Sequence, residues 1–445
     1  MTTHQIGRIV VGCLVAGLVV ALGLVVGPLG GAQEHVITGT VLLTFAASWA
    51  LLSALSTLWA NQPQRWAAWP AVFMGVAGAG ILAFAPGSSV LDVLGWIWPP
   101  LFLLLLAGTA VGVHRDLRSR SRFWIVYPLL GLYALSAVGG AHQTVREAVE
   151  RRLYPAPGQL VDVGGHRLHL NCTGSGAPTV ILESGLGETG DYWGWISAAV
   201  ARDTKVCAYD RAGRGWSDPA AAPQDGAEVA RDLHTLLDRG LVQGPLVLVG
   251  HSTGAQYVRI FAGRYPEQVA GMVLLDGQPA EVFEDLPAFP TFYRSFRRVS
   301  ALLPSLARLG VARLFDPDGS ASLPAEARDR LRLNHSSARL FRSLRDEFAQ
   351  LPTALAQARS FQSLGDRPLI VVTATRDAMA GWLPLQDAMA TLSTNSRHDV
   401  VPYEHFELVA DETAAHASSQ AIRDVVSAVR SASPLSKSST TIGKE

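Results

Sequence analysis

The sequence carries little charge. Acidic and basic side chains make up 17% of the 445 residues, and the formal net charge is +0. Without a basic excess, nothing in the composition supports a nucleic-acid partner. Charge is scarcest before residue 145. We therefore divide the chain into a membrane region of residues 1–145, a globular domain of residues 146–432 and a polar tail of residues 433–445. The composition of the tail is typical of disorder.

Long apolar runs fill the membrane region. Each run is close to the roughly 20 residues that a helix needs to cross the hydrocarbon core of a bilayer. A buried helical bundle of a soluble protein would show polar faces at helical spacing, and these runs show almost none. The sequence therefore predicts about five transmembrane helices, at residues 7–28, 36–60, 66–85, 93–113 and 123–141.

Arginine-rich loops predict how these helices are oriented. Short loops rich in Lys and Arg remain in the cytoplasm. If all five runs span, Arg8 and Arg65 fall on the same side as the arginine-rich loop of residues 114–122, while the loops at 31–35 and 86–89 carry no Lys or Arg. Three arginines after the fifth run, Arg146, Arg151 and Arg152, oppose this orientation. We predict an integral protein of the plasma membrane whose globular domain lies outside the cytoplasm.

The globular domain alternates short apolar runs with segments of helical spacing. Segments 226–241 and 255–265 are typical of amphipathic helices. Strands that alternate with helices indicate a mostly parallel sheet with helices on both faces. Residues 277–366 break the rhythm, and we interpret them as an inserted helical cap. The predicted strands are residues 160–163, 167–171, 179–182, 205–209, 246–249, 271–275, 369–373 and 399–402.

A serine stands on the turn between the strand at 246–249 and the following helix. The stretch from Gly250 to Gly254 fits G-x-S-x-G, the nucleophile elbow. The glycines permit a turn too tight for side chains, and the turn exposes the hydroxyl of Ser252. The alternative is a strand–helix turn with an inert serine, which this strand-and-helix context disfavours.

A serine hydroxyl needs a base and an acid to become a nucleophile. This fold places them in the chain order serine, acid, histidine. Asp377 follows the strand at 369–373 and His405 follows the last strand, so we predict a Ser252–His405–Asp377 triad. The alternative acid is Asp276, which also ends a strand, and His398 and His416 are the alternative bases. We expect His251, beside the serine, to serve only in packing.

The tetrahedral oxyanion of acyl transfer needs fixed N–H donors. One is expected from the backbone of Thr253, directly after the nucleophile. The other is expected from the loop after the third strand, where Gly185 and Gly187 let the backbone approach closely. We assign Leu186 as this second donor, with a plain glycine-rich turn as the alternative.

Residues 157–430 resemble the α/β-hydrolase superfamily. The segment CAYDRAGRGWSDP (207–219) is similar to the loop after the fourth strand in many of its esterase-like members, and GRYPEQVAGMVLLDG (263–277) is similar to their passage from a helix to the sixth strand. The resemblance implies the α/β-hydrolase fold, with an eight-stranded sheet and a cap, and the site residues given above. Two positions depart from the usual pattern: Ser184 stands where a histidine is common, and Glu404 where a glycine is common. The serine at position 252 argues against members that use an aspartate nucleophile, the dehalogenases and epoxide hydrolases.

Three cysteines are present. Cys13 lies within the first apolar run, where packing explains it. Cys172 and Cys207 lie on the second and fourth strands, which the resemblance implies are neighbours. A disulfide between them is therefore a candidate, and it requires an oxidising compartment. Two buried free thiols are the alternative.

These features together predict a membrane-anchored serine hydrolase, similar to carboxylesterases and lipases. We expect it to cleave an ester, or alternatively an amide, through an acyl-enzyme. The expected partners are a small-molecule or lipid-like ester and the membrane. No metal, organic cofactor or nucleic acid is expected. An acyltransferase with the same triad and a non-catalytic binding module on a membrane scaffold are the alternatives. Aromatic residues near the start of the cap suggest an apolar substrate group, although they also suit the core of the cap.

Overall fold

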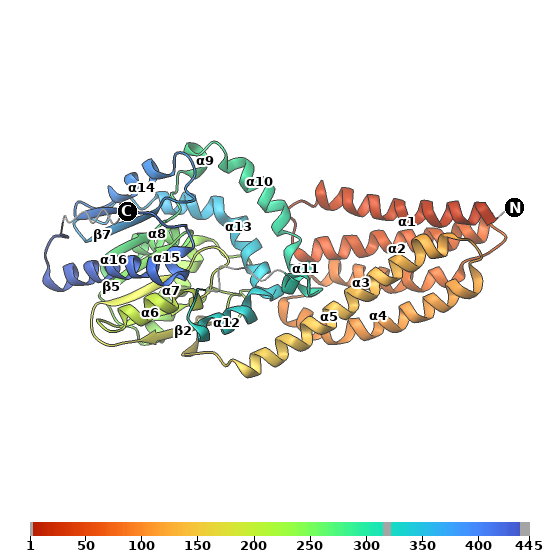
Figure 1. Ribbon diagram of the computed structural model, residues 1–445, viewed down its shortest axis with the longest axis horizontal. Helices are drawn as coiled ribbons and strands as arrows, with labels where there is room; N and C mark the ends of the chain where they lie inside the picture. The colour runs from red at the N-terminus through yellow and green to blue at the C-terminus, as the bar shows by residue number, and fades with distance from the viewer. Residues whose placement is uncertain (1–2, 315–321, 437–445) are drawn as a thin grey trace. The chain divides into compact units, whose positions relative to one another are not determined.

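The computed structural model describes residues 3–314 and 322–436, so most of the predicted polar tail, residues 437–445, lies outside the described residues. The chain forms two compact units (Figure 1). The first, the helical unit, combines Met1–Arg152 with Ser295–Phe315 and Ser336–Ala338. The second, the sheet unit, holds the remainder. Part of the predicted cap insertion therefore groups with the N-terminal helices.

Long helices that lie side by side dominate the helical unit (Figure 1). Five of them are long and apolar enough to cross a membrane. Large apolar side chains such as Val19, Leu104 and Leu135 are exposed on their outer surfaces, as lipid contact requires. Small residues let neighbours approach closely: a Cβ on Gly39 of α2 would lie 3.0 Å from the Gly78 carbonyl oxygen of α3. The helices are α1 Thr3–Val26, α2 Glu34–Trp59, α3 Ala68–Phe84, α4 Ser88–Asp116 and α5 Tyr127–Leu153, with short turns η1 Arg65–Ala67 and η2 Arg122–Val126 before α3 and α5.

The arginine-bearing loops meet at one end of the helical unit. Gln64 Nε2 donates to the Asp116 carbonyl at 3.4 Å, and the Arg118 N–H donates to Gln62 Oε1 at 3.2 Å. A Cβ on Gly7 would lie 2.9 Å from Ser119 Oγ, which brings the start of α1 to the same place. The loops that the sequence analysis places on one side of the membrane therefore lie at one end of the helical unit.

The other end of the helical unit holds a segment of the cap insertion. Arg308 at the end of α11 (Leu303–Arg308) donates to Glu34 Oε1 at 2.7 Å and to Asp92 Oδ1 at 3.2 Å. The hydroxyls of Thr38 and Ser305 lie 2.9 Å apart. α2 and α4 therefore contact part of the cap insertion at this end.

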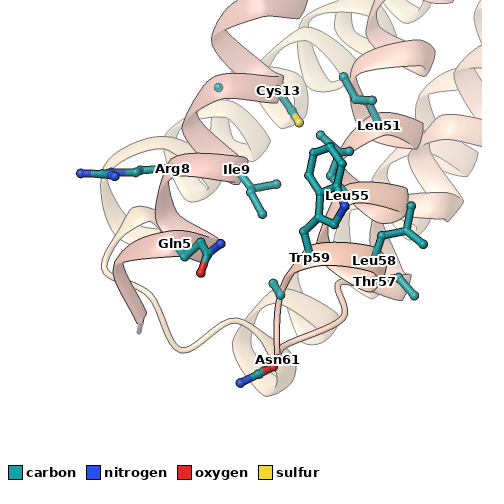
Figure 2. Close-up of a pocket in the computed structure, with 12 residues that line it drawn as sticks. Gln5, Arg8, Ile9, Cys13, Leu51, Leu55, Thr57, Leu58, Trp59 and Asn61 are labelled. Atoms are coloured by element: carbon teal, nitrogen blue, oxygen red, sulfur yellow. The ribbon is translucent and has the colours of Figure 1, made fainter. Parts of the chain in front are cut away.

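A pocket of about 740 Å³ opens between α1 and α2 (Figure 2). In Figure 2, Ile9 and Cys13 from α1 face Leu55 and Trp59 from α2. The side chain of Arg8 points away from Trp59. The lining is mostly apolar, which agrees with a packing role for Cys13 and offers no nucleophile paired with a base.

The sheet unit contains one eight-stranded sheet, as predicted. The order is β1-β2-β4-β3-β5-β6-β7-β8. β2 is antiparallel to β1 and β4, and the six strands from β3 to β8 are parallel to one another. Cys172 of β2 lies directly opposite Cys207 of β4, and a disulfide joins the two. The strands are β1 Gln159–Asp162, β2 Arg167–Thr173, β3 Thr179–Glu183, β4 Val206–Tyr209, β5 Leu246–His251, β6 Val269–Leu275, β7 Leu369–Ala374 and β8 Ser396–Val401.

Apolar helix faces cover the sheet. Ile196 of α6 and Val425 of α16 pack with Val180, Val247 and Val273 in one core cluster of this unit. The helix α7 packs against α8, which follows β5. Helices outside the cap are η3 Gly190–Trp193, α6 Gly194–Val200, α7 Gly226–Arg239, α8 Gly254–Arg264, η4 Pro266–Gln268, α14 Trp382–Ala390, α15 Glu407–Ala410 and α16 Glu412–Ser431.

The cap insertion is helical, as its lack of strand patterning indicated. Its aromatic residues pack on one another: the ring centroids of Phe283 and Tyr293 lie 5.1 Å apart, and those of Tyr293 and Phe348 lie 5.0 Å apart. These contacts give them a place in the core of the cap. The elements are α9 Val282–Asp285, α10 Phe289–Ser300, α11, η5 Val311–Leu314, α12 Ala325–His335 and α13 Ala338–Arg359.

Candidate active site

Ser252 occupies a sharp turn between β5 and α8. Its φ is 53°, a left-handed value that a side chain adopts only when the surroundings impose it. The flanking glycines are required by space: a Cβ on Gly250 would lie 2.7 Å from the Ala255 nitrogen, and one on Gly254 would overlap the Glu183 carbonyl. The Ser252 N–H donates to the Leu275 carbonyl of β6 at 3.1 Å, which holds the turn beside that strand. The predicted elbow geometry is present.

His405 follows β8, and its imidazole is paired with a carboxylate. Nδ1 lies 2.6 Å from Oδ2 of Asp276, the residue directly after β6. Asp276 is 4% exposed, and its other oxygen accepts the Trp382 indole N–H at 2.8 Å. Asp276 also has a positive φ, 41°. A carboxylate held in this way fixes the ring so that Nδ1 carries a proton and Nε2 is left to act as the base.

Asp377 does not contact the imidazole, which corrects the predicted triad. Its Oδ1 accepts the backbone N–H of His405 at 3.0 Å, and the residue is exposed. Both acids follow parallel strands and therefore reach the same sheet edge. β6 is the neighbour of β5, however, whereas Asp377 follows β7, one strand further away. The alternative acid of the sequence analysis, Asp276, is thus the residue that the fold pairs with His405.

The loop after β3 lies against the serine. A Cβ on Gly185 would be 2.9 Å from the Ser252 Cβ, so only glycine allows this approach. Leu186 follows in the loop, and Thr253 occupies the position directly before α8. In the described part of the chain, the backbone N–H of neither residue donates to a protein acceptor. Both groups are therefore available to an oxyanion.

A second histidine–carboxylate pair lies beside His405. His251 Nδ1 is 2.7 Å from Glu188 Oε1, His251 Nε2 donates to the His405 carbonyl at 3.1 Å, and the two imidazole centroids lie 4.6 Å apart. Burial opposes charge on the ring, but the Glu188 carboxylate raises the pKa of His251 above its ordinary value. Burial also opposes charge on Glu188, yet His251 holds the pKa of this carboxyl below its ordinary value. His251 therefore contacts both a carboxylate and His405, so its surroundings include polar partners besides the packing that we expected.

Glu188 also reaches the loop that carries Leu186. Its Oε2 accepts the Gly185 N–H at 2.5 Å. Ser184, where histidine is common in the similar proteins, accepts the Trp193 indole N–H at 2.9 Å. A carboxylate in the glycine-rich loop after β3 was the signal that sequence analysis could have used. Among the described residues, no group of three or more His, Cys, Asp or Glu side chains is placed to hold a metal ion.

Comparison with known proteins identifies the fold family. Residues 178–408, just over half of the chain, match the model of the α/β-hydrolase fold family. The chain belongs to this family. It has the α/β-hydrolase fold, and five helices that could span a membrane precede the matched region.

Individual relatives match only in part. An uncharacterised protein of Schizosaccharomyces pombe is 29% identical over 283 residues, 55% of this chain and 51% of that protein. RutD of Pseudomonas savastanoi, which is named as a carbamate hydrolase, is 37% identical over 113 residues, 25% of this chain and 42% of that protein. The chain thus spans about half the length, or less, of these curated relatives. The crystal structure of wild-type DBJA shares the fold, with a TM-score of 0.51 and 16% identity over 62% of this chain and 100% of that chain.

Proposed function

We propose that this protein is a membrane-anchored serine hydrolase that cleaves an ester through an acyl-enzyme. Ser252 is the nucleophile, His405 the general base and Asp276 the acid that orients the imidazole. The backbone N–H groups of Leu186 and Thr253 bind the oxyanion. The observation that carries the proposal is the pair formed by His405 Nδ1 and the buried Asp276 carboxylate, 2.6 Å apart, beside a serine on a strained strand–helix turn.

The proposed reaction is that of a Ser-His-Asp triad. His405 Nε2 takes the hydroxyl proton as Ser252 Oγ attacks the ester carbonyl carbon. The carbonyl oxygen becomes an oxyanion, which accepts hydrogen bonds from the two N–H groups. The imidazolium then gives its proton to the departing alcohol, and an acyl-serine remains. Water attacks the acyl carbon, His405 takes one of its protons, and the acid leaves as Ser252 regains its hydrogen.

The proposed location is the plasma membrane, with the sheet unit outside the cytoplasm. Two independent features support it. The disulfide between Cys172 and Cys207 is stable in an oxidising compartment. The arginine-bearing loops gather at the end of the helical unit opposite the Arg308 contacts, as the positive-inside rule requires for the cytoplasmic end.

The test is hydrolysis of p-nitrophenyl esters of graded acyl length by the purified full chain in detergent. We expect turnover by the wild type and its loss in Ser252→Ala. A folded wild type that cleaves none of these esters would contradict the proposal and favour a non-catalytic module. Addition of an alcohol acceptor, with product analysis, identifies an acyltransferase by transfer that exceeds hydrolysis.

A carbamate is the second candidate substrate class, because the chain is similar to RutD of Pseudomonas savastanoi over part of its length. A carbamate carbonyl is attacked through the same tetrahedral oxyanion. Matched phenyl acetate and phenyl carbamate substrates separate the two classes by their kcat/KM values. A higher value for the carbamate would replace the ester assignment.

A further inference from the structure

A buried charge cluster lies behind the loop that carries Leu186. Arg211 and Arg214, which follow β4, are 6% and 1% exposed. Arg211 is paired with Glu183 at the end of β3, and both arginines are paired with Glu347 of the cap helix α13. Glu347 is 9% exposed. Two cations and two carboxylates thus meet in a site closed to solvent, where removing one partner leaves a costly unpaired charge.

The two arginines hold the peptide that contains the proposed donor. The Gly185 carbonyl accepts from Arg211 Nη2 at 2.9 Å and from Arg214 Nη1 at 2.6 Å. The carbonyl of Gly185 and the N–H of Leu186 belong to one planar trans peptide, so they point in opposite directions. By fixing the carbonyl, the guanidinium groups turn the Leu186 N–H away from themselves. The direction of one oxyanion donor is therefore set by charge-assisted hydrogen bonds.

Glu347 connects this arrangement to the other donor. Its carboxylate oxygens lie 3.1 Å from Arg211 Nη2, and it also accepts from Arg214. Its Oε1 accepts the hydroxyl of Thr253 at 3.1 Å. Thr253 supplies the other proposed N–H. One carboxylate therefore contacts the two arginines that orient the Gly185–Leu186 peptide and the side chain of the second donor residue.

We propose that Glu347 is a positioning residue through which the cap helix α13 sets the geometry of the oxyanion hole. The inference rests on the proposed function. Glu347 touches no reacting atom; it acts through Arg211, Arg214 and Thr253. Because Glu347 belongs to the cap insertion, correct seating of α13 completes the machinery that stabilises the transition state. The cap is thus a part of the active site and not only a cover for it.

The test compares Glu347→Gln with Glu284→Gln in the full chain. Glu284 is a second cap carboxylate, paired with Arg359 on the exposed surface, and it makes no contact with the oxyanion loop. Losing one complete oxyanion donor costs roughly 10²- to 10³-fold in kcat. For Glu347→Gln, which disturbs both donors without deleting either, we expect at least a roughly tenfold lower kcat per labelled site. We expect KM to change by less than about threefold, because ground-state binding does not use the hole.

Parallel readouts separate positioning from folding. Sites are counted by fluorophosphonate labelling, so unfolded protein does not lower the measured kcat, and melting temperature is recorded for each variant. Glu347→Asp, which keeps the charge, should recover part of the activity. Thr253→Val removes the hydroxyl and keeps the backbone N–H. The loss of kcat in the double variant should be smaller than the product of the losses in Thr253→Val and Glu347→Gln, because the two side chains act through one contact.

Each result decides the inference. An unchanged or higher kcat in Glu347→Gln, or a loss confined to melting temperature, would overturn it while the proposed function stands. Multiplicative losses in the double variant would overturn the connection through Thr253. A wild type that neither labels nor turns over would overturn the proposed function together with this inference.

Discussion

Replacing either of two aspartates by asparagine tests which acid serves His405. In Asp276→Asn, an amide replaces the carboxylate that lies 2.6 Å from Nδ1. The amide can donate to Nδ1 and so favour the wrong tautomer, and it no longer stabilises the imidazolium. In an unrelated serine hydrolase, the equivalent change lowers kcat about 10⁴-fold. We expect a loss of about 10³- to 10⁴-fold here, which is about 4–5.5 kcal/mol of transition-state stabilisation.

Asp377→Asn is the matched control. Its Oδ1 accepts the His405 backbone N–H at 3.0 Å from an exposed position, and an asparagine oxygen can accept the same bond. A hydrogen bond of this kind contributes about 1 kcal/mol, so we expect at most about a fivefold loss. The assay is steady-state hydrolysis of a p-nitrophenyl ester by wild type and both variants, with the folded fraction checked by melting temperature. Equal losses in the two variants, or the larger loss in Asp377→Asn, would refute the assignment of Asp276.

Three further predictions concern stability, measured by thermal unfolding in detergent. Glu188→Gln should lower the melting temperature most between pH 4.5 and 6.5, where both members of the pair contribute fully to stability. The contribution of Glu188 is lost as pH falls through its lowered pKa, and that of His251 is lost as pH rises through its raised pKa. A difference in melting temperature that does not depend on pH would contradict this. Arg308→Met should cost about 3 kcal/mol, because Glu34 is left buried, whereas Arg115→Met, from an exposed pair, should cost under about 1 kcal/mol. Equal effects would count against the cap contact. Reduction of the disulfide, which closes a separation of 35 residues, should cost about 3–4 kcal/mol, and an unchanged melting temperature would oppose that value.

The fold could be predicted because its signals are local. Each predicted strand of the globular domain overlaps a strand of the structure, and the glycines around Ser252 marked the turn that the structure contains. Each of the five long apolar runs of the N-terminal region is likewise long enough to cross a bilayer as a helix. Strand ends and turn residues are fixed by their immediate neighbours in the sequence. They can therefore be predicted without the tertiary structure.

The acid of the site could not be chosen in this way. Asp276 and Asp377 both follow parallel strands, so chain order left each as a candidate. The choice depends on which side chain points toward the imidazole, and this is set by the positive φ of Asp276 and its bond to Trp382. These are tertiary features, and no local pattern carries them.

Residues of the cap were harder still to assign. Glu347 lies in an insertion with no alternation of strands and helices to place it, and its partners Arg211 and Arg214 are more than 100 residues away in the sequence. The segment around Arg308 was expected in the cap, but its ion pairs with Glu34 and Asp92 place it in the helical unit. Long-range pairing of charges leaves no signature at either position.

The most direct test of the central claim is peptide mass spectrometry after fluorophosphonate treatment of the intact protein in detergent. The account predicts a single phosphonylated site at Ser252, absent in Ser252→Ala and formed at least about 10³-fold more slowly in His405→Ala, because a serine without its base is a poor nucleophile. Folded wild-type protein that stays unmodified, or that carries the adduct on another residue, would contradict it.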